Sequence, residues 1–176
     1  MARIRSRDKR KARQAKQRSR QCETNVSNVG GLFVIGSAYK RGEQNTPLQS
    51  DQVTDIKIAT QLALDNMIKG KSTSDDWGMV AGAMNTAMVL SEQGYGFEHL
   101  DIFIRAQEAV ARSYERGTRT GSWRFDGPGL QDVLTAVDLH EQQCDLVTIG
   151  DIKGALEEVE YRAKHGNTFQ IERVTV

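Results

Sequence analysis

Residues 74–94, SDDWGMVAGAMNTAMVLSEQG, decide the fold that the sequence predicts. Aspartates open this segment, where a helix dipole favours negative charge, and Gly94 follows its last turn. One face carries apolar residues at helical spacing, namely Trp77, Val80, Ala81, Met84, Ala87 and Met88. Small residues cluster along it, namely Gly78, Ala81, Gly82, Ala83 and Ala87. We predict a central helix over residues 75–93, N-capped by Ser74, that other helices approach on more than one side.

Four further helical segments surround this one in the sequence, each with an apolar stripe. They are residues 51–69 before Gly70, 97–116 before Gly117, 129–145, and a helix from the capping-box-like Thr148-Ile149-Gly150-Asp151 to about Lys164. The stripe of the first contains Val53, Ile56, Ala59, Leu62, Ala63 and Met67, and that of the second includes Leu100, Phe103, Ile104, Val110, Ala111 and Tyr114. Short loops join the helices, so the predicted class is all-α, a small bundle of about five helices.

Two segments outside the bundle have a strand-like composition. We divide the chain into a basic arm (1–24), a connector with a short extended segment (25–50), the helical bundle (51–166) and a C-terminal extended segment (167–176). Residues 32–39 and 168–176 are rich in β-branched and aromatic side chains. The two could pair as a short two-stranded clasp, which would have to pack on the helices to be stable.

Charge is divided unevenly along the 176 residues. Residues 1–20, MARIRSRDKRKARQAKQRSR, contain ten Lys or Arg and one Asp, a net charge of +9. Residues 21–176 contain fourteen Lys or Arg and twenty-two Asp or Glu, a net charge of −8. The basic segment has no apolar run after it, which argues against a secretory signal, and no stretch approaches the roughly 20 apolar residues of a membrane span.

The composition of the arm indicates a contact with a polyphosphate. With one Ile and no aromatic residue it cannot bury enough apolar surface to offset the entropy of ordering, so we expect disorder without a partner. The candidate nucleic-acid-binding residues are Arg3, Arg5, Arg7, Lys9, Arg10, Lys11, Arg13, Lys16, Arg18 and Arg20. They would contact the phosphates of DNA or RNA without reading its sequence. Alternatives are an acidic protein, a membrane surface, a tail that folds back on the acidic body, or a passive solubility tail. A membrane is disfavoured because the arm lacks Trp, Phe and Leu.

A second basic feature lies in the loop before residue 129. Arg116, Arg119 and Arg124 flank Trp123 there in a glycine-bearing segment, a pattern that can stack an unpaired base. The competing interpretation is structural, with Trp123 and Phe125 packed on the bundle. If the arm binds nucleic acid, this loop is the predicted second contact.

Acidic residues dominate the C-terminal third and suggest a different class of function. Residues 130–160 hold eight acids against Lys153 alone. A protein-binding inhibitor of a host or defence complex could use Asp151, Glu157, Glu158 and Glu160 as its contact face.

Motifs for catalysis, cofactors and metals are weak or incomplete. Lys69-Gly70-Lys71-Ser72 ends like a phosphate loop, but Asp65 stands where the first glycine belongs and the segment closes a helix. His140 and Cys144 are four residues apart and could share a helix face, yet no motif supplies further metal ligands. We therefore predict no enzyme activity, no cofactor and no metal.

A scattered set of residues resembles another group of proteins. The set is Ala63-Leu64-Asp65, Gly70, Ser72-Thr73, Asp76-Trp77, Ala83-Met84-Asn85, Glu92, Gly94, Gly96, Ala106-Gln107, Thr120-Gly121, Trp123, Asp126-Gly127 and Leu139-His140. It is similar to uncharacterised small helical proteins encoded by proteobacterial phages and plasmids. The resemblance implies an accessory protein of a mobile element that acts in the bacterial cytoplasm, and it assigns no functional residue.

Three hypotheses follow, in order of preference. The first is a non-enzymatic nucleic-acid-binding accessory protein, whose bundle forms a homodimer or presents a surface to a partner. The second is the inhibitor of a host protein complex, and the third is a structural component of a virion or nucleoid.

Overall fold

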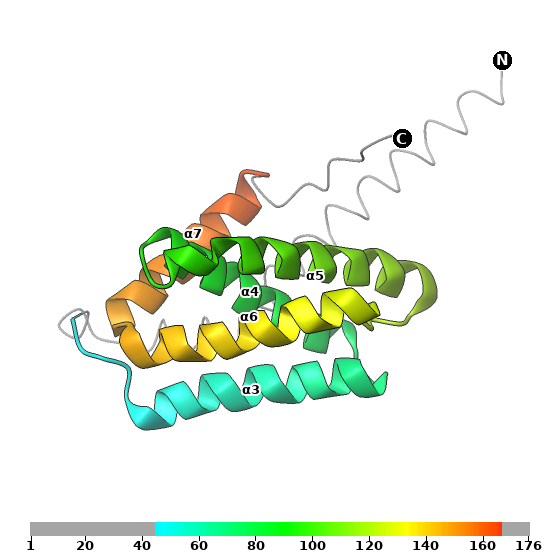
Figure 1. Ribbon diagram of the computed structural model, residues 1–176, viewed down its shortest axis with the longest axis horizontal. Coiled ribbons are helices and arrows are strands. Elements are labelled where there is room, and N and C mark those ends of the chain that lie inside the picture. The colour runs from blue at the N-terminus through cyan, green and yellow to red at the C-terminus, as the bar shows by residue number, and fades with distance from the viewer. Residues whose placement is uncertain (1–44, 167–176) are drawn as a thin grey trace, which may run out of the picture.

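The computed structural model describes residues 45–166, which form five α-helices and one short 3-10 helix without a strand. In chain order these are α3 (Ser50–Lys69), α4 (Ser74–Glu92), η1 (Phe97–His99), α5 (Leu100–Thr120), α6 (Gly127–Leu146) and α7 (Ile149–Lys164). The predicted all-α bundle of about five helices is confirmed (Figure 1). The basic arm and both segments of the predicted clasp, residues 32–39 and 168–176, lie outside the described residues.

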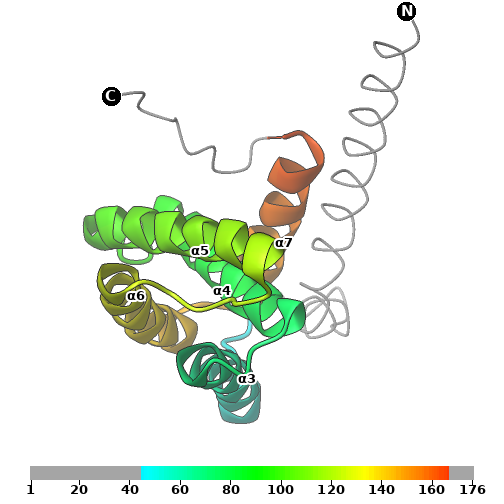
Figure 2. The same ribbon diagram turned by 90° about the vertical axis from the view of Figure 1, so that its right-hand side faces the viewer.

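Helix α4 is the centre of the bundle, as the small residues of its sequence predict. It contacts α3, α5, α6 and α7, and Figure 2 shows the other helices arranged around it. Gly78, Gly82, Ala83 and Ala87 are all buried, so neighbouring helices approach its backbone on several sides. This explains why its apolar residues are spread around the helix rather than confined to one stripe.

The core consists of two clusters that meet along α4. The larger joins α3, α4, α5 and α6 and includes the fully buried Met84, Phe103 and Val133. The smaller joins the start of α3, the ends of α4 and α6, and α7, with Leu90 and Leu156 at its centre. Burying one such side chain contributes roughly 1.5–3 kcal/mol, so these clusters supply most of the stabilisation.

The helix ends confirm some predicted caps and correct others. Gly70 ends α3 with φ 68°, and Thr148 and Asp151 form the expected capping box of α7. The N-cap of α4 is Thr73 rather than Ser74, because the Thr73 hydroxyl accepts from the amides of Asp75 and Asp76.

Two further boundaries differ from the sequence prediction. Helix α5 runs past Gly117 and ends at Gly121, whose φ is 76°. Helix α6 starts at Gly127, ahead of the predicted residue 129, because the Asp126 carboxylate accepts from the amide of Gly129 at 2.7 Å and caps it.

Two apolar residues that the stripes assigned to the core are exposed instead. Leu62 is 61% exposed and Ile104 is 36% exposed. The stripe on α3 was wrong at Leu62 because nine residues separate it from Val53, which is two and a half turns and places it on the opposite side of the helix. Ile58 is 60% exposed on the same side as Leu62.

The chain enters the bundle beside the start of α7. The amide of Ile149 donates to the carbonyl of Thr46 at 2.9 Å, and Pro47 and Thr148 form an isolated antiparallel bridge. None of the helices within residues 45–166 has the length and apolar content needed to cross a membrane.

Candidate nucleic-acid interface

Three of the predicted nucleic-acid-binding residues lie in the described part of the chain: Arg119, Trp123 and Arg124. The ten cations of the arm lie outside it. Arg119 is in the last turn of α5, and the other two belong to the loop that joins α5 to α6. The geometry of this loop decides which of them can meet a ligand.

The ring of Trp123 packs against the bundle. Its centroid lies 5.9 Å from the rings of both Trp77 and Tyr114, which are themselves 4.8 Å apart. The Ser113 hydroxyl donates to the carbonyl of Trp123 at 2.6 Å and holds the loop against α5. Trp123 therefore makes the packing contacts that the structural interpretation expects, and base stacking by its half-buried ring stays a prediction.

Arg124 crosses from the loop to the C-terminal end of α3. Its Nη2 donates to the carbonyl of Lys69 at 3.1 Å, and its guanidinium fills the space that a side chain on Gly70 would need. Arg116 Nη1 in turn donates to the carbonyl of Arg124 at 3.0 Å. The loop is thus held by α3 on one side and α5 on the other, with the Arg124 side chain still exposed.

Four cations lie at the end of the bundle where α3 and α5 end, and we call Lys71, Arg116, Arg119 and Arg124 the basic end. Figure 1 shows the α3–α4 and α5–α6 connections at the same end of the bundle. None of the four forms an ion pair within residues 45–166. The nearby Arg112 differs, since its Nε lies 2.9 Å from Asp126 Oδ2. The Arg112 guanidinium, and to a lesser degree Arg116, hold the pKa of Asp126 below its ordinary value.

Sequence reasoning did not place Lys71 at the same end of the bundle as this loop. It treated Lys69-Gly70-Lys71-Ser72 only as a failed phosphate-loop motif. The contact between Arg124 and the carbonyl of Lys69 joins residues 55 apart in sequence, and no local signal encodes that distance. The one available hint was Gly70, whose left-handed conformation turns the chain at this point.

The acidic residues proposed as a protein-binding face have partners within the described residues. Glu157 lies 3.9 Å from Lys153, Glu158 lies 2.7 Å from Arg162, and Glu160 lies 2.6 Å from Lys164. Arg162 and Lys164 follow directly after the window that was counted as acidic. The concentration of free negative charge is therefore smaller than the sequence count implied.

Asp151 has a structural role at the start of α7. Its carboxylate accepts from the Thr148 amide at 2.8 Å and from the Tyr95 hydroxyl at 2.8 Å. Burial raises the pKa of Asp151, but these hydrogen bonds outweigh burial and hold the pKa below its ordinary value. Its charge therefore serves helix capping and the attachment of the α4–α5 turn.

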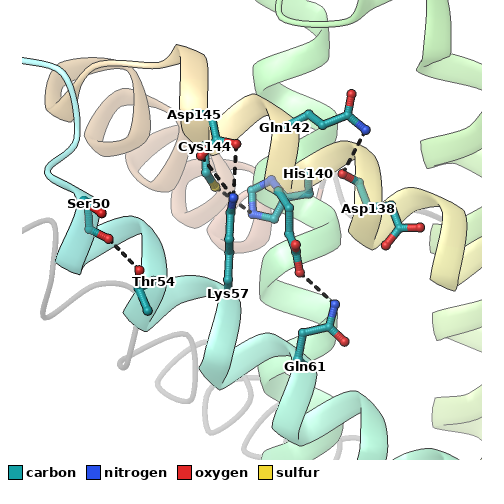
Figure 3. A network of polar contacts seen from close by, with 10 residues as sticks. Ser50, Thr54, Lys57, Gln61, Asp138, His140, Gln142, Cys144 and Asp145 are labelled. Carbon is teal, nitrogen blue, oxygen red and sulfur yellow. Dashed lines mark hydrogen bonds and ion pairs between the residues drawn. The ribbon is translucent and has the colours of Figure 1, made fainter.

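His140 and Cys144 are buried side chains of α6, next to the contacts between α6 and α3 (Figure 3). His140 Nδ1 lies 3.2 Å from Gln143 Oε1, and Gln143 donates to the carbonyls of Ala87 and Tyr95. Burial lowers the pKa of His140 and raises that of the Cys144 thiol to about 12. No group of three or more metal-ligating side chains occurs among residues 45–166.

Comparisons with family models, curated proteins and solved structures give no match to this chain. The resemblance to phage and plasmid proteins therefore stays a prediction, and any function has to be argued from the residues themselves.

Proposed function

We propose that the chain is a non-enzymatic nucleic-acid-binding protein that contacts phosphates through residues 1–20 and through the basic end. The observation that carries this proposal is the separation of charge, +9 in residues 1–20 against −8 in the remainder. Ten cations on a segment with one Ile and no aromatic residue cannot be organised by a core of their own. A polyphosphate would gain affinity from each contact through release of condensed counterions.

The basic end supports a second contact of the same kind. None of its four cations forms an ion pair within residues 45–166, and Arg124 is oriented by the carbonyl of Lys69. A guanidinium held in this way loses less side-chain freedom when it meets a phosphate. Because the ring of Trp123 is used in packing, the proposal is limited to phosphate contacts and includes no base recognition.

The inhibitor hypothesis has less support than nucleic-acid binding. Three of its four contact residues, Glu157, Glu158 and Glu160, pair with cations one turn along α7. Exposed pairs of this type contribute little to stability, yet they reduce the field that a basic partner would meet.

Removing the arm tests the main contact. Fluorescence anisotropy with labelled single-stranded DNA, duplex DNA and RNA of equal length compares the full chain with residues 21–176. We expect the full chain to bind all three and the truncated chain to lose at least about tenfold in affinity. Circular dichroism should show the same helical signal for both. Equal binding by the two chains would refute the proposal.

A matched pair of double variants tests the basic end in the full chain. Lys71→Gln with Arg119→Gln removes two exposed cations that have no ion pair, whereas Lys153→Gln with Lys164→Gln removes two that pair with Glu157 and Glu160. Both double variants lower the net charge by two. The first should weaken binding and reduce the salt slope by about 2, and the second should have a smaller effect. Equal effects would show that only overall charge matters and would remove the basic end from the proposal.

A further inference from the structure

Helix α3 uses only one side for packing. It contacts α4 and α6, and it lies at the edge of the bundle in Figures 1 and 2. Lys57 and Gln61 point towards α6, where they meet Asp145 and Glu141 (Figure 3). The side away from α4 is left without a neighbour from the described part of the chain.

The outer side of α3 carries an ordered stripe, which we call the α3 outer face. Its residues follow one another at intervals of four, three, four, three and four, which keeps them on one side of a helix. They are Asp51, Asp55, Ile58, Leu62, Asp65 and Lys69. Ile58 and Leu62, 60% and 61% exposed, form an apolar centre with charged residues at both ends.

The apolar centre and the outermost charges of this stripe are complementary to themselves when a second copy runs antiparallel to it. A two-fold axis at residue 60 sets Ile58 against the partner's Leu62 and Asp51 against the partner's Lys69. Each contact then occurs twice, as a symmetric dimer requires. A parallel arrangement would instead place like residues together and bring Asp51 against the partner's Asp51.

The charges at the two ends are accessible for this contact. Asp51 and Asp55 form no ion pair within residues 45–166. Lys69 pairs with Asp65 of its own helix at 2.6 Å, and both side chains are about half exposed, so the ammonium can also meet a carboxylate from another copy. Asp55 would face the partner's Asp65, and the neighbouring Lys69 reduces that repulsion.

We propose that the α3 outer face is the contact surface of a homodimer in which two α3 helices pack antiparallel. The inference goes beyond nucleic-acid binding and does not depend on it. If both hold, one particle carries two basic arms, and its avidity for a long polyphosphate exceeds that of a single arm. The apolar centre is small compared with standard interfaces, so the dimer should be concentration-dependent.

Sedimentation equilibrium of the nuclease-treated full chain tests the proposal. Protein concentrations from about 10 to 500 μM cover the range in which a small interface is expected to dissociate. The wild type should pass from monomer to dimer across this range, and Leu62→Asp should remain a monomer. Phe97→Asp is the matched control, because Phe97 is also 60% exposed but lies on η1, and it should dimerise like the wild type. Circular dichroism checks that each variant is folded.

A charge exchange tests the antiparallel arrangement itself. Asp51→Lys and Lys69→Asp should each weaken the dimer, because each sets like charges against one another at both symmetric contacts. The double variant restores opposite charges at both and should recover the dimer. A wild type that stays monomeric throughout, for instance because other residues of its own chain cover α3, would overturn the proposal. So would a Leu62→Asp variant that dimerises normally, or a double variant without recovery.

Discussion

The ring of Trp123 occupies the space directly above Gly117 on α5. A Cβ added at position 117 would lie 2.3 Å from Cδ2 and Cε3 of that ring. Gly117 is inside the helix, not at its end, and its missing side chain is what allows the α5–α6 loop to fold back onto the bundle. This contact keeps Trp123 in the aromatic group with Trp77 and Tyr114, and it positions Arg124 towards α3.

Gly117→Ala should therefore destabilise the protein, although alanine favours helices. The added methyl group forces the indole to move, and we expect a loss of about 1–3 kcal/mol in the free energy of unfolding. Gly154 provides the matched control, because it lies within α7 with nothing inside 4 Å of an added Cβ. Gly154→Ala should stabilise by about 0.5–1 kcal/mol. Urea unfolding measures both, and a shift of the same sign for the two variants would contradict this account of Gly117.

The start of α4 offers a direct comparison of two adjacent hydroxyl residues. The Thr73 hydroxyl accepts hydrogen bonds from two backbone amides, and the Asp76 carboxylate accepts one from the Thr73 amide at 2.7 Å. Thr73→Ala should cost about 1 kcal/mol in unfolding free energy, whereas Ser74→Ala should change it little. A larger loss of unfolding free energy for Ser74→Ala than for Thr73→Ala would show that Ser74 is the N-cap, as the sequence predicted.

His140 should make stability depend on pH between about 7 and 5. Burial lowers its pKa in the folded state, so below the ordinary pKa of about 6.5 the unfolded chain binds a proton that the folded chain does not. Stability is then fully present above this value and falls as the pH falls. His140→Gln should flatten the dependence of Tm on pH in this range. An unchanged slope in His140→Gln would show that other groups cause it.

Cys144 should be unreactive until the protein unfolds. Its side chain is buried, and burial raises the pKa of its thiol to about 12, so little thiolate is present at pH 8. A Cys22→Ser variant leaves Cys144 as the single thiol. Modification by a thiol reagent should be slow in buffer and rapid in urea, and rapid labelling of the native protein would show that this part of the core opens readily.

Much of the fold could be predicted from local patterns. The central position of α4 follows from its small residues, and the ends of α3 and α7 follow from Gly70 and the Thr148–Asp151 box. The errors arose where the exposure of a residue or the end of a helix depends on geometry over several turns or on residues distant in the chain. Leu62 needed a correct count of helical turns, and the reason for a glycine at position 117 is a ring six residues further on, which packs where a side chain would be.

The candidate site was less accessible to sequence reasoning. Arg119 and Arg124 were found because they flank a tryptophan, although the tryptophan itself packs on the bundle. Lys71 joins them only through the contact of Arg124 with α3. The acids of the C-terminal third seemed unpaired because the cations of Glu158 and Glu160 follow just beyond the acidic segment, and because Asp145 on α6 pairs with Lys57 of α3.

The dependence of binding on salt tests the central claim most directly. Affinity of the full chain for single-stranded DNA can be measured by anisotropy between 50 and 200 mM NaCl. If most of the ten arm cations of residues 1–20 contact phosphates, the affinity should fall by about 10³-fold or more over this range, linearly in a double-logarithmic plot. Absence of binding at 50 mM, or an affinity that salt leaves unchanged, would contradict the account.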